Sequence, residues 1–116
     1  MKIYNLNLKS NIILGSSRYP SPKVFRNCIK KSGANMITVA VRRLVPGSED
    51  FLKVIRKTKC HVLPNTAGCY SVDEAVTTAE MARELFQTDL IKLEVIEDSK
   101  TLKPSMKGTI KATVLI

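Results

Sequence analysis

Short apolar runs recur along the chain, and each predicts a buried β-strand. Ile12–Leu14, Met36–Val41, His61–Leu63 and Asp89–Ile96 are the four runs. Their centres lie 23 to 31 residues apart, which is the length of a strand plus a crossover helix. The repeat therefore predicts strands that alternate with helices.

The stretches between the strands carry helix signals. Three serines precede stretches with helical spacing, and each can cap a helix: Ser21, Ser48 and Ser71. A last helix is predicted to begin near Ser105. Glu74 completes a capping-box spacing with Ser71. One apolar stripe follows that box: Ala75, Val76, Ala79, Ala82, Leu85 and Phe86. A stripe of this kind predicts a helix face in the core rather than a cofactor site.

The run Asp89–Ile96 holds two charges in an apolar strand. Side chains alternate along a strand, so Lys92 and Glu94 share one face, opposite Leu93 and Val95. A structural ion pair is one explanation for opposite charges on a buried strand. The other is a site in which a desolvated lysine forms an imine with a carbonyl while the carboxylate moves protons. Spacing alone leaves both open.

Composition is that of one soluble globular domain, residues 1–116. The chain is 44% hydrophobic and 25% charged. No apolar run reaches the ~18 residues of a membrane helix, and the N-terminus lacks a secretory signal. These features predict a cytoplasmic protein without membrane contact, or one of the plastid stroma if it is plastid-encoded.

A net charge of +9 favours anionic partners. The basic residues are dispersed, however, and the pair Arg42-Arg43 is typical of a solvated strand end. The chain has only six aromatic side chains on which nucleic-acid bases could stack. Phosphate-bearing small molecules are therefore favoured over nucleic acid.

Metal and cofactor motifs are missing from the sequence. Cys28, Cys60 and Cys69 form no C-x-x-C pair, which predicts reduced thiols and neither a disulfide framework nor a zinc site. His61, the only histidine, begins an apolar strand, where a structural role is expected. No G-x-G-x-x-G or Walker lysine is present, so no nucleotide cofactor is predicted.

Strand-helix units in series imply an α/β fold with a parallel sheet, either an open doubly wound sheet or part of a (β/α)₈ barrel. In a barrel, the face with Lys92 and Glu94 would point inward, near the catalytic mouth.

Several spaced motifs resemble thiazole synthase of thiamine biosynthesis. They are Gly15–Tyr19, Ser32–Ala34, Ile37–Arg43, Leu63–Cys69, Lys92–Ile96 and Gly108–Thr113. Motifs in the same order over nearly the whole chain are more specific than any one of them.

The resemblance implies the N-terminal half of a (β/α)₈ TIM barrel, with four parallel βα units. It implies an enzyme that condenses 1-deoxy-D-xylulose 5-phosphate, dehydroglycine and the thiocarboxylate sulfur of a sulfur-carrier protein into a thiazole phosphate. The family's imine-forming lysine falls on Lys92, and a carboxylate of its proton transfers falls on Glu94.

A full barrel takes ~250 residues, so the resemblance places the phosphate-binding loops and another catalytic acid outside residues 1–116. We expect impaired activity from this half alone, and self-association through open strand edges. A non-catalytic fragment or interaction module that keeps the family's partner surface is the alternative. The missing half could be lost or supplied by a second chain.

Overall fold

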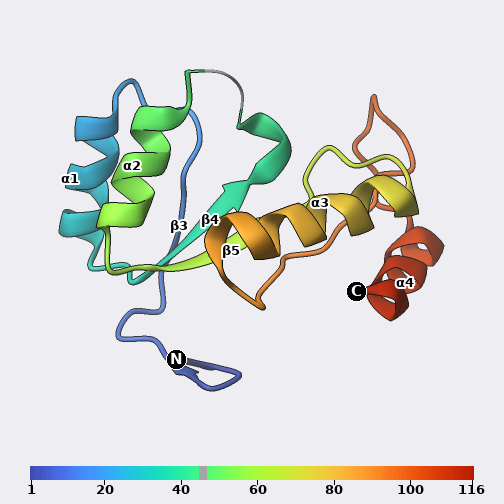
Figure 1. The fold of residues 1–116 in the computed structure, drawn as a ribbon, viewed down its shortest axis with the longest axis horizontal. Coiled ribbons are helices and arrows are strands. Elements are labelled where there is room, and N and C mark those ends of the chain that lie inside the picture. The colour runs from blue at the N-terminus through green and yellow to red at the C-terminus, as the bar shows by residue number, and fades with distance from the viewer. Residues whose placement is uncertain (45–46) are drawn as a thin grey trace. The chain divides into compact units, whose positions relative to one another are not determined.

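The computed structural model, which describes residues 1–44 and 47–116, has a mixed α/β fold with parallel strands (Figure 1). It divides into two units. The described residues of Met1–Val39 and Val45–Val62 form unit 1, and Ala40–Leu44 with Leu63–Ile116 forms unit 2. The α/β class predicted from the sequence is therefore confirmed.

Parallel strands begin side by side in unit 1. β3 (Ile13–Gly15) pairs in parallel with β4 (Met36–Ala40), and the sheet order is β3-β4-β5, where β5 is His61–Asn65. The His61 N–H donates to the Asn35 carbonyl at 2.8 Å, which brings the starts of β4 and β5 together. Three of the four predicted strands are thus present.

Local capping chemistry fixes the first helix, α1 (Pro22–Ser32). The Ser21 hydroxyl accepts the Val24 N–H at 3.3 Å, and Pro22 occupies the first turn, where no N–H partner is needed. Gly33 ends the helix at φ 66°, in the left-handed region that glycine tolerates. The predicted start and stop of this helix are both confirmed.

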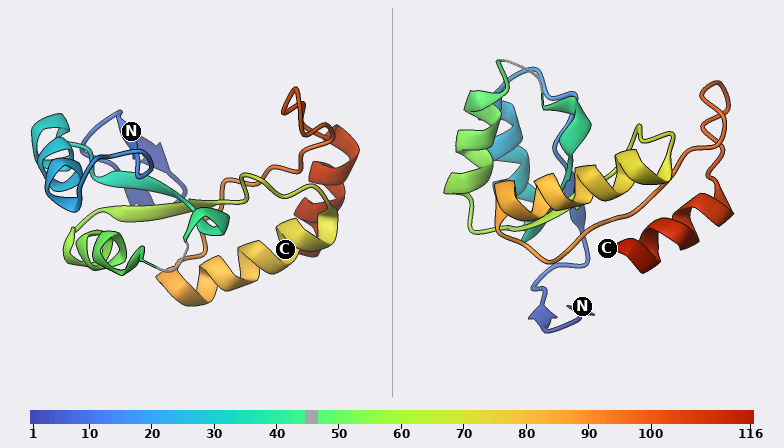
Figure 2. Two further views of the ribbon diagram at one scale, coloured as in Figure 1. Left: turned by 90° about the horizontal axis from the view of Figure 1, so that it is seen from above. Right: turned by 45° about the vertical axis from the view of Figure 1, so that its right-hand side comes forward.

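The second helix, α2 (Glu49–Lys57), packs with α1. Both helices are seen end-on in the left panel of Figure 2. Ser48 lies at the predicted N-cap, where its carbonyl accepts the Leu52 N–H at 3.0 Å. The aromatic ring of Phe25, fully buried on α1, lies 4.9 Å from Tyr19 and 6.1 Å from Phe51 between ring centroids. Phe25 belongs to the unit 1 core, and the half-buried rings of Tyr19 and Phe51 lie beside it.

One burial expectation in unit 1 is wrong. Ile13 was expected inside the sheet, yet it is 39% exposed. β3 is a three-residue strand with β4 on one side only, so among the described residues little covers it.

The N-terminus forms a hairpin that the sequence pattern did not predict. β1 (Lys2–Ile3) pairs antiparallel with β2 (Leu6–Asn7), and the turn between them holds Tyr4 at φ 50°. Positive φ is unusual for a bulky residue. Without a glycine or an Asn-Gly pair, the turn carries no sequence signal.

Two long helices organise unit 2. α3 (Val72–Phe86) packs against α4 (Met106–Leu115) and against the 3₁₀ turn η1 (Val41–Arg43). The predicted strand through Val41 therefore ends at Ala40, because the chain turns into η1. The apolar core joins α3 and α4 with the loop after β5 and the segment 92–96, around four buried residues: Cys69, Ala75, Val95 and Ala112.

The helix predictions for unit 2 are confirmed. The Ser71 hydroxyl accepts the Glu74 N–H at 3.1 Å, and the Ser105 hydroxyl accepts the Gly108 N–H at 3.1 Å. Ala75, Ala79 and Ala82 are buried, as the stripe predicted. The cysteines are free thiols, with Cys69 fully buried.

The fourth predicted strand is wrong as a regular element. Within Asp89–Ile96 only isolated bridges form: Lys92 pairs in parallel with Asn65, and Ile96 pairs antiparallel with Pro104. Between these bridges the Thr66 side chain, rather than a backbone group, bonds the N–H and the carbonyl of Glu94. The segment 92–96 nevertheless runs beside the end of β5 in the predicted parallel direction.

Within residues 1–44 and 47–116, no helix combines the length and apolarity needed to cross a membrane.

Candidate functional site

The segment 92–96 is fixed to the end of β5 by an alternating set of hydrogen bonds. The Lys92 N–H donates to the Pro64 carbonyl at 2.8 Å, and the Thr66 N–H donates to the Lys92 carbonyl at 3.3 Å. Glu94 lies two residues after Lys92. There the Thr66 hydroxyl accepts from the Glu94 N–H at 2.8 Å and donates to the Glu94 carbonyl at 2.7 Å. The Ile96 N–H then donates to the Cys69 carbonyl at 2.8 Å.

The other edge of the segment is held by the start of α4. The Ser105 N–H donates to the Val95 carbonyl at 2.7 Å, and the Val95 N–H donates to the Thr109 hydroxyl at 3.2 Å. Val95 is 2% exposed and belongs to the core. The alternation predicted from the sequence therefore buries the Val95 face of the segment.

Lys92 and Glu94 lie on the opposite face, which is more open than predicted. Lys92 is exposed and Glu94 is half-buried. Among the described residues, no strand flanks Lys92 on the side away from β5, so its side chain is left to solvent. The prediction of a strand buried on both faces is wrong here. The described part of the chain also shows no ion pair between Lys92 and Glu94.

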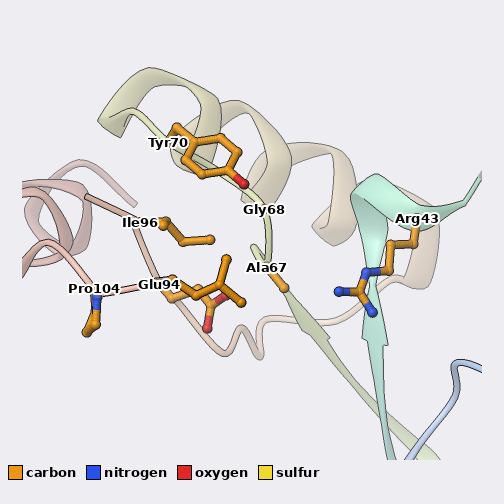
Figure 3. Close-up of a pocket in the computed structure, with 8 residues that line it drawn as sticks. Arg43, Ala67, Gly68, Tyr70, Glu94, Ile96 and Pro104 are labelled. Carbon is orange, nitrogen blue, oxygen red and sulfur yellow. The ribbon is translucent and has the colours of Figure 1, made fainter. Parts of the chain in front are cut away.

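Glu94 lines a pocket of about 390 Å³ in unit 2 (Figure 3). The lining residues come from η1, from the loop after β5, from the segment 92–96 and from residues 102–104: Arg43, Ala67, Gly68, Tyr70, Glu94, Ile96, Leu102 and Pro104. Lys92 is not among them. The structure thus brings one of the two predicted site residues into a cavity and leaves the other outside it.

Arg43 extends from η1 into the same pocket. In Figure 3 its guanidinium points toward Ala67, and the Glu94 side chain lies beyond Ala67. The hydroxyl end of Tyr70 points toward the Gly68 side of the cavity. The sequence pattern assigned Arg43 to a solvated strand end. Sequence reasoning could not distinguish Arg42 from Arg43, because the η1 turn is what sends their side chains in different directions.

Arg42, by contrast, points to α3. Its guanidinium lies 2.9 Å from the Glu74 carboxylate, whose same oxygen accepts the Tyr70 N–H at 2.7 Å. This backbone hydrogen bond and the Arg42 charge hold the pKa of Glu74 below its usual value. A hydrogen bond to the Cys69 thiol and the Glu74 charge raise the pKa of Arg42. The Arg42–Glu74 ion pair therefore connects η1 to the first turn of α3, which follows the loop that lines the pocket.

No cluster of metal-ligating side chains is present in residues 1–44 and 47–116. The groups that could act on a ligand in the pocket are the Glu94 carboxylate, the Arg43 guanidinium and the Tyr70 hydroxyl. They can exchange protons and bind charged groups.

Comparison with known proteins identifies the family. Residues 2–116 match the model of "Thiazole biosynthesis protein ThiG". The chain belongs to the ThiG family. It is 46% identical over 119 residues to thiazole synthase of Rhodopseudomonas palustris strain BisB5, with 100% of this chain and 46% of that protein covered.

Other thiazole synthases match similarly. The identity is 47% over 116 residues with the protein of Bradyrhizobium sp. strain BTAi1 and 45% over 116 residues with that of Rhizobium meliloti strain 1021. In both cases 97% of this chain covers 45% of the relative. The chain thus spans slightly less than half the length of these ThiG-family relatives. The resemblance inferred from the spaced motifs is confirmed.

Two residues of the candidate site were missed by sequence reasoning. Thr66 was given no role of its own, yet its fully buried hydroxyl fixes the backbone of Glu94. Arg43 was set aside, yet it lines the pocket. A signal for Thr66 was available, since a polar residue directly after a buried strand must find a hydrogen-bond partner.

Proposed function

We propose that this chain carries the imine-forming part of a thiazole synthase. In this proposal Lys92 forms the imine with 1-deoxy-D-xylulose 5-phosphate, and Glu94 moves the protons. The observation that carries it is the shared face of Lys92 and Glu94 on a segment whose backbone is hydrogen-bonded to Pro64 and Thr66. Family membership supports the reaction class.

The proposed chemistry needs both side chains. The Lys92 nitrogen attacks the ketone carbon of the sugar phosphate, a C–N bond forms, and the carbonyl oxygen leaves as water. An ammonium must lose a proton before it can attack, and the leaving oxygen must gain protons. We assign these transfers to the Glu94 carboxylate. The later substrates of the proposal are dehydroglycine and the thiocarboxylate of a sulfur-carrier protein.

We also propose that residues 1–116 form the N-terminal half of a (β/α)₈ barrel. Parallel strands with intervening helices support this architecture. A whole barrel takes ~250 residues, and this chain covers 46% of a full-length relative. We therefore expect the phosphate-binding loops and a further catalytic acid to lie outside residues 1–116, and this chain alone to turn over little substrate.

An exposed apolar stripe on α4 supports the second candidate function, a non-catalytic interaction module that binds a partner. Met106, Ile110 and Val114 are 78%, 61% and 81% exposed, and their four-residue spacing puts them on one helix face. An exposed stripe of this kind is typical of a contact surface. We propose that the chain self-associates through it. Sedimentation showing a stable monomer at micromolar concentration would contradict self-association.

The experiment that tests the enzyme proposal is reductive trapping. The chain is incubated with 1-deoxy-D-xylulose 5-phosphate and borohydride, and the modified residue is mapped by mass spectrometry. We expect one adduct, on Lys92. Lys92→Arg keeps the positive charge but has no primary amine, so it should lose the adduct.

Lys100→Arg is the matched control, because Lys100 is also an exposed lysine of unit 2. It should keep the adduct at the wild-type level. An adduct that survives Lys92→Arg would assign the imine to another lysine. No adduct in the wild-type chain would favour the non-catalytic interaction module.

A further inference from the structure

The positive charge of the protein is gathered in one of its two units. Unit 1 contains eleven of the 19 Lys and Arg residues and only two of the 10 Asp and Glu residues. It therefore carries the whole net charge of +9, whereas unit 2 has eight residues of each sign and is neutral. Basic residues that are dispersed along the sequence are thus concentrated by the fold.

The two helices of unit 1 hold six of these cations on their outer faces. α1 and α2 pack side by side (Figure 1). On each helix three cations recur at helical spacing, on the face turned away from a buried residue, which is Phe25 in α1 and Ile55 in α2. These helix cations are all exposed: Lys23, Arg26 and Lys30 on α1, and Lys53, Arg56 and Lys57 on α2.

Few anions neutralise the helix cations. Lys53 Nζ lies 3.1 Å from the Asp50 carboxylate, and both side chains are exposed, so this ion pair contributes little. Within residues 1–44 and 47–116, no other helix cation forms an ion pair. Like charges on successive turns of a helix repel one another. An anionic partner with several charges would relieve this repulsion.

The helix cations lack the apolar anchor that a protein partner requires. Protein interfaces bind mainly through a desolvated centre, in which aromatic side chains are common. The rings of α1 and α2 belong to Phe25, which is fully buried, and Phe51, which is half-buried. Val24, at 38%, is the only large apolar side chain exposed on the described residues of the two helices. The surface therefore fits a partner that binds through charge alone.

We propose that the α1–α2 face of unit 1 binds the phosphate backbone of double-stranded nucleic acid without reading its sequence. A duplex carries one negative charge per about 1.7 Å of its axis. The helix cations of one helix follow one another at one to four residues, or about 1.5–6 Å along the helix axis, so each meets a phosphate in any register. The inference goes beyond the imine chemistry, because no helix cation lines the pocket or belongs to the segment 92–96.

Salt dependence of binding tests the inference, measured on the whole chain by fluorescence anisotropy of a short labelled DNA duplex. The five helix cations other than Lys53 predict a slope of about −4.5 for log affinity against log salt concentration, or a loss of about 500-fold between about 50 and 200 mM salt. The single strand of the same sequence should bind more weakly, because neither helix exposes a ring on which its bases stack.

Three substitutions together remove the cations of α1: Lys23→Gln, Arg26→Gln and Lys30→Gln. This triple variant should weaken duplex binding about tenfold or more at about 0.1 M salt and reduce the slope by about 3. Replacing Lys23 and Lys30 by Arg keeps every charge and should leave the affinity within about twofold of wild type. The comparison separates lost charge from lost helix structure.

The matched control removes three exposed cations from unit 2: Lys100→Gln, Lys107→Gln and Lys111→Gln. It has the same net charge as the α1 variant but keeps all helix cations. Its affinity for the duplex should stay within about threefold of wild type. Equal weakening by the two triple variants would overturn the inference, because total charge rather than the α1–α2 face would then determine binding.

Two competitors test the chemical nature of the partner. Poly-L-glutamate presents many carboxylates on one chain, and inorganic phosphate is a small anion. Unlabelled duplex should displace the labelled duplex at a lower concentration of negative charge than either competitor. Displacement by poly-L-glutamate at the same charge concentration would assign the face to an acidic protein, and displacement by inorganic phosphate would assign it to small phosphates. Either result overturns the inference, as does a duplex that does not bind at about 50 mM salt.

Discussion

The Thr66 hydroxyl makes two hydrogen bonds to one residue, donating to the Glu94 carbonyl at 2.7 Å and accepting from the Glu94 N–H at 2.8 Å. Thr66 is fully buried. Its side chain occupies the place that a backbone partner would take in a regular parallel ladder. The position of Glu94 therefore depends on a single side chain at the end of β5.

Thr66→Val keeps the shape of the side chain but removes both hydrogen bonds. The N–H and carbonyl of Glu94 would lose their partner, and we expect the free energy of unfolding to fall by about 1–3 kcal/mol. Urea denaturation measures this. Thr66→Ser keeps the hydroxyl and should lose clearly less stability. Equal losses in the two variants would mean that packing of the methyl group, and not hydrogen bonding, holds the segment.

Glu74 should make the stability of the chain depend on pH. The Tyr70 N–H and the Arg42 charge lower its pKa in the folded state from the usual 4.5. A lowered folded-state pKa means that the carboxylate contributes stability above pH 4.5, and this contribution is lost as the pH falls through the lowered pKa. The difference in unfolding free energy between wild type and Glu74→Gln should thus be constant above pH 4.5 and shrink below it.

Asp73→Asn provides the control for that comparison. It removes a carboxylate from the same first turn of α3, without the Arg42 contact. Its stability difference from wild type should change less steeply below pH 4.5 than that of Glu74→Gln. Chemical denaturation at a series of pH values measures both. Parallel curves for the two variants would show that the helix terminus, rather than Arg42 and Tyr70, sets the effect.

Gly108→Ala should destabilise the chain although alanine is the better helix former. A Cβ at Gly108 would lie 3.0 Å from Val95 Cγ1 and 3.0 Å from Ser105 Oγ. Val95 is buried, and the Ser105 hydroxyl holds the Gly108 N–H, so neither neighbour moves freely. We expect a loss of about 1–3 kcal/mol from overpacking in place of the gain of about 1 kcal/mol that an open helix site would give.

A double variant tests the cause of that loss. Val95→Ala removes one of the two atoms that a Cβ at Gly108 would meet at 3.0 Å, and leaves Ser105 Oγ in place. Gly108→Ala should therefore cost less in the Val95→Ala background than in the wild type, as measured by thermal or urea unfolding. Additive losses would place the strain elsewhere.

Local signals made the helices predictable from sequence. Ser21, Ser71 and Ser105 each accept the N–H three residues on, and the Ser71 cap begins a helix whose alanine stripe is buried. Capping and periodicity act within one or two turns of the chain, so they need no tertiary information. The placement of Lys92 and Glu94 on one face and Val95 on the other is also local, because successive side chains of an extended segment point to opposite faces.

The site depended on contacts between distant residues. The Lys92 face was predicted to be buried because apolar neighbours favour burial, but exposure depends on which strand lies alongside, and only β5 does so among the described residues. The pairing of Thr66 with Glu94 spans 28 residues. The different directions of Arg42 and Arg43 follow from the η1 turn. Sequence alone determined the helices, the strand direction and the family motifs, because these follow from neighbouring residues. Tertiary structure decided which charges line the pocket, because a cavity forms only where separate segments meet.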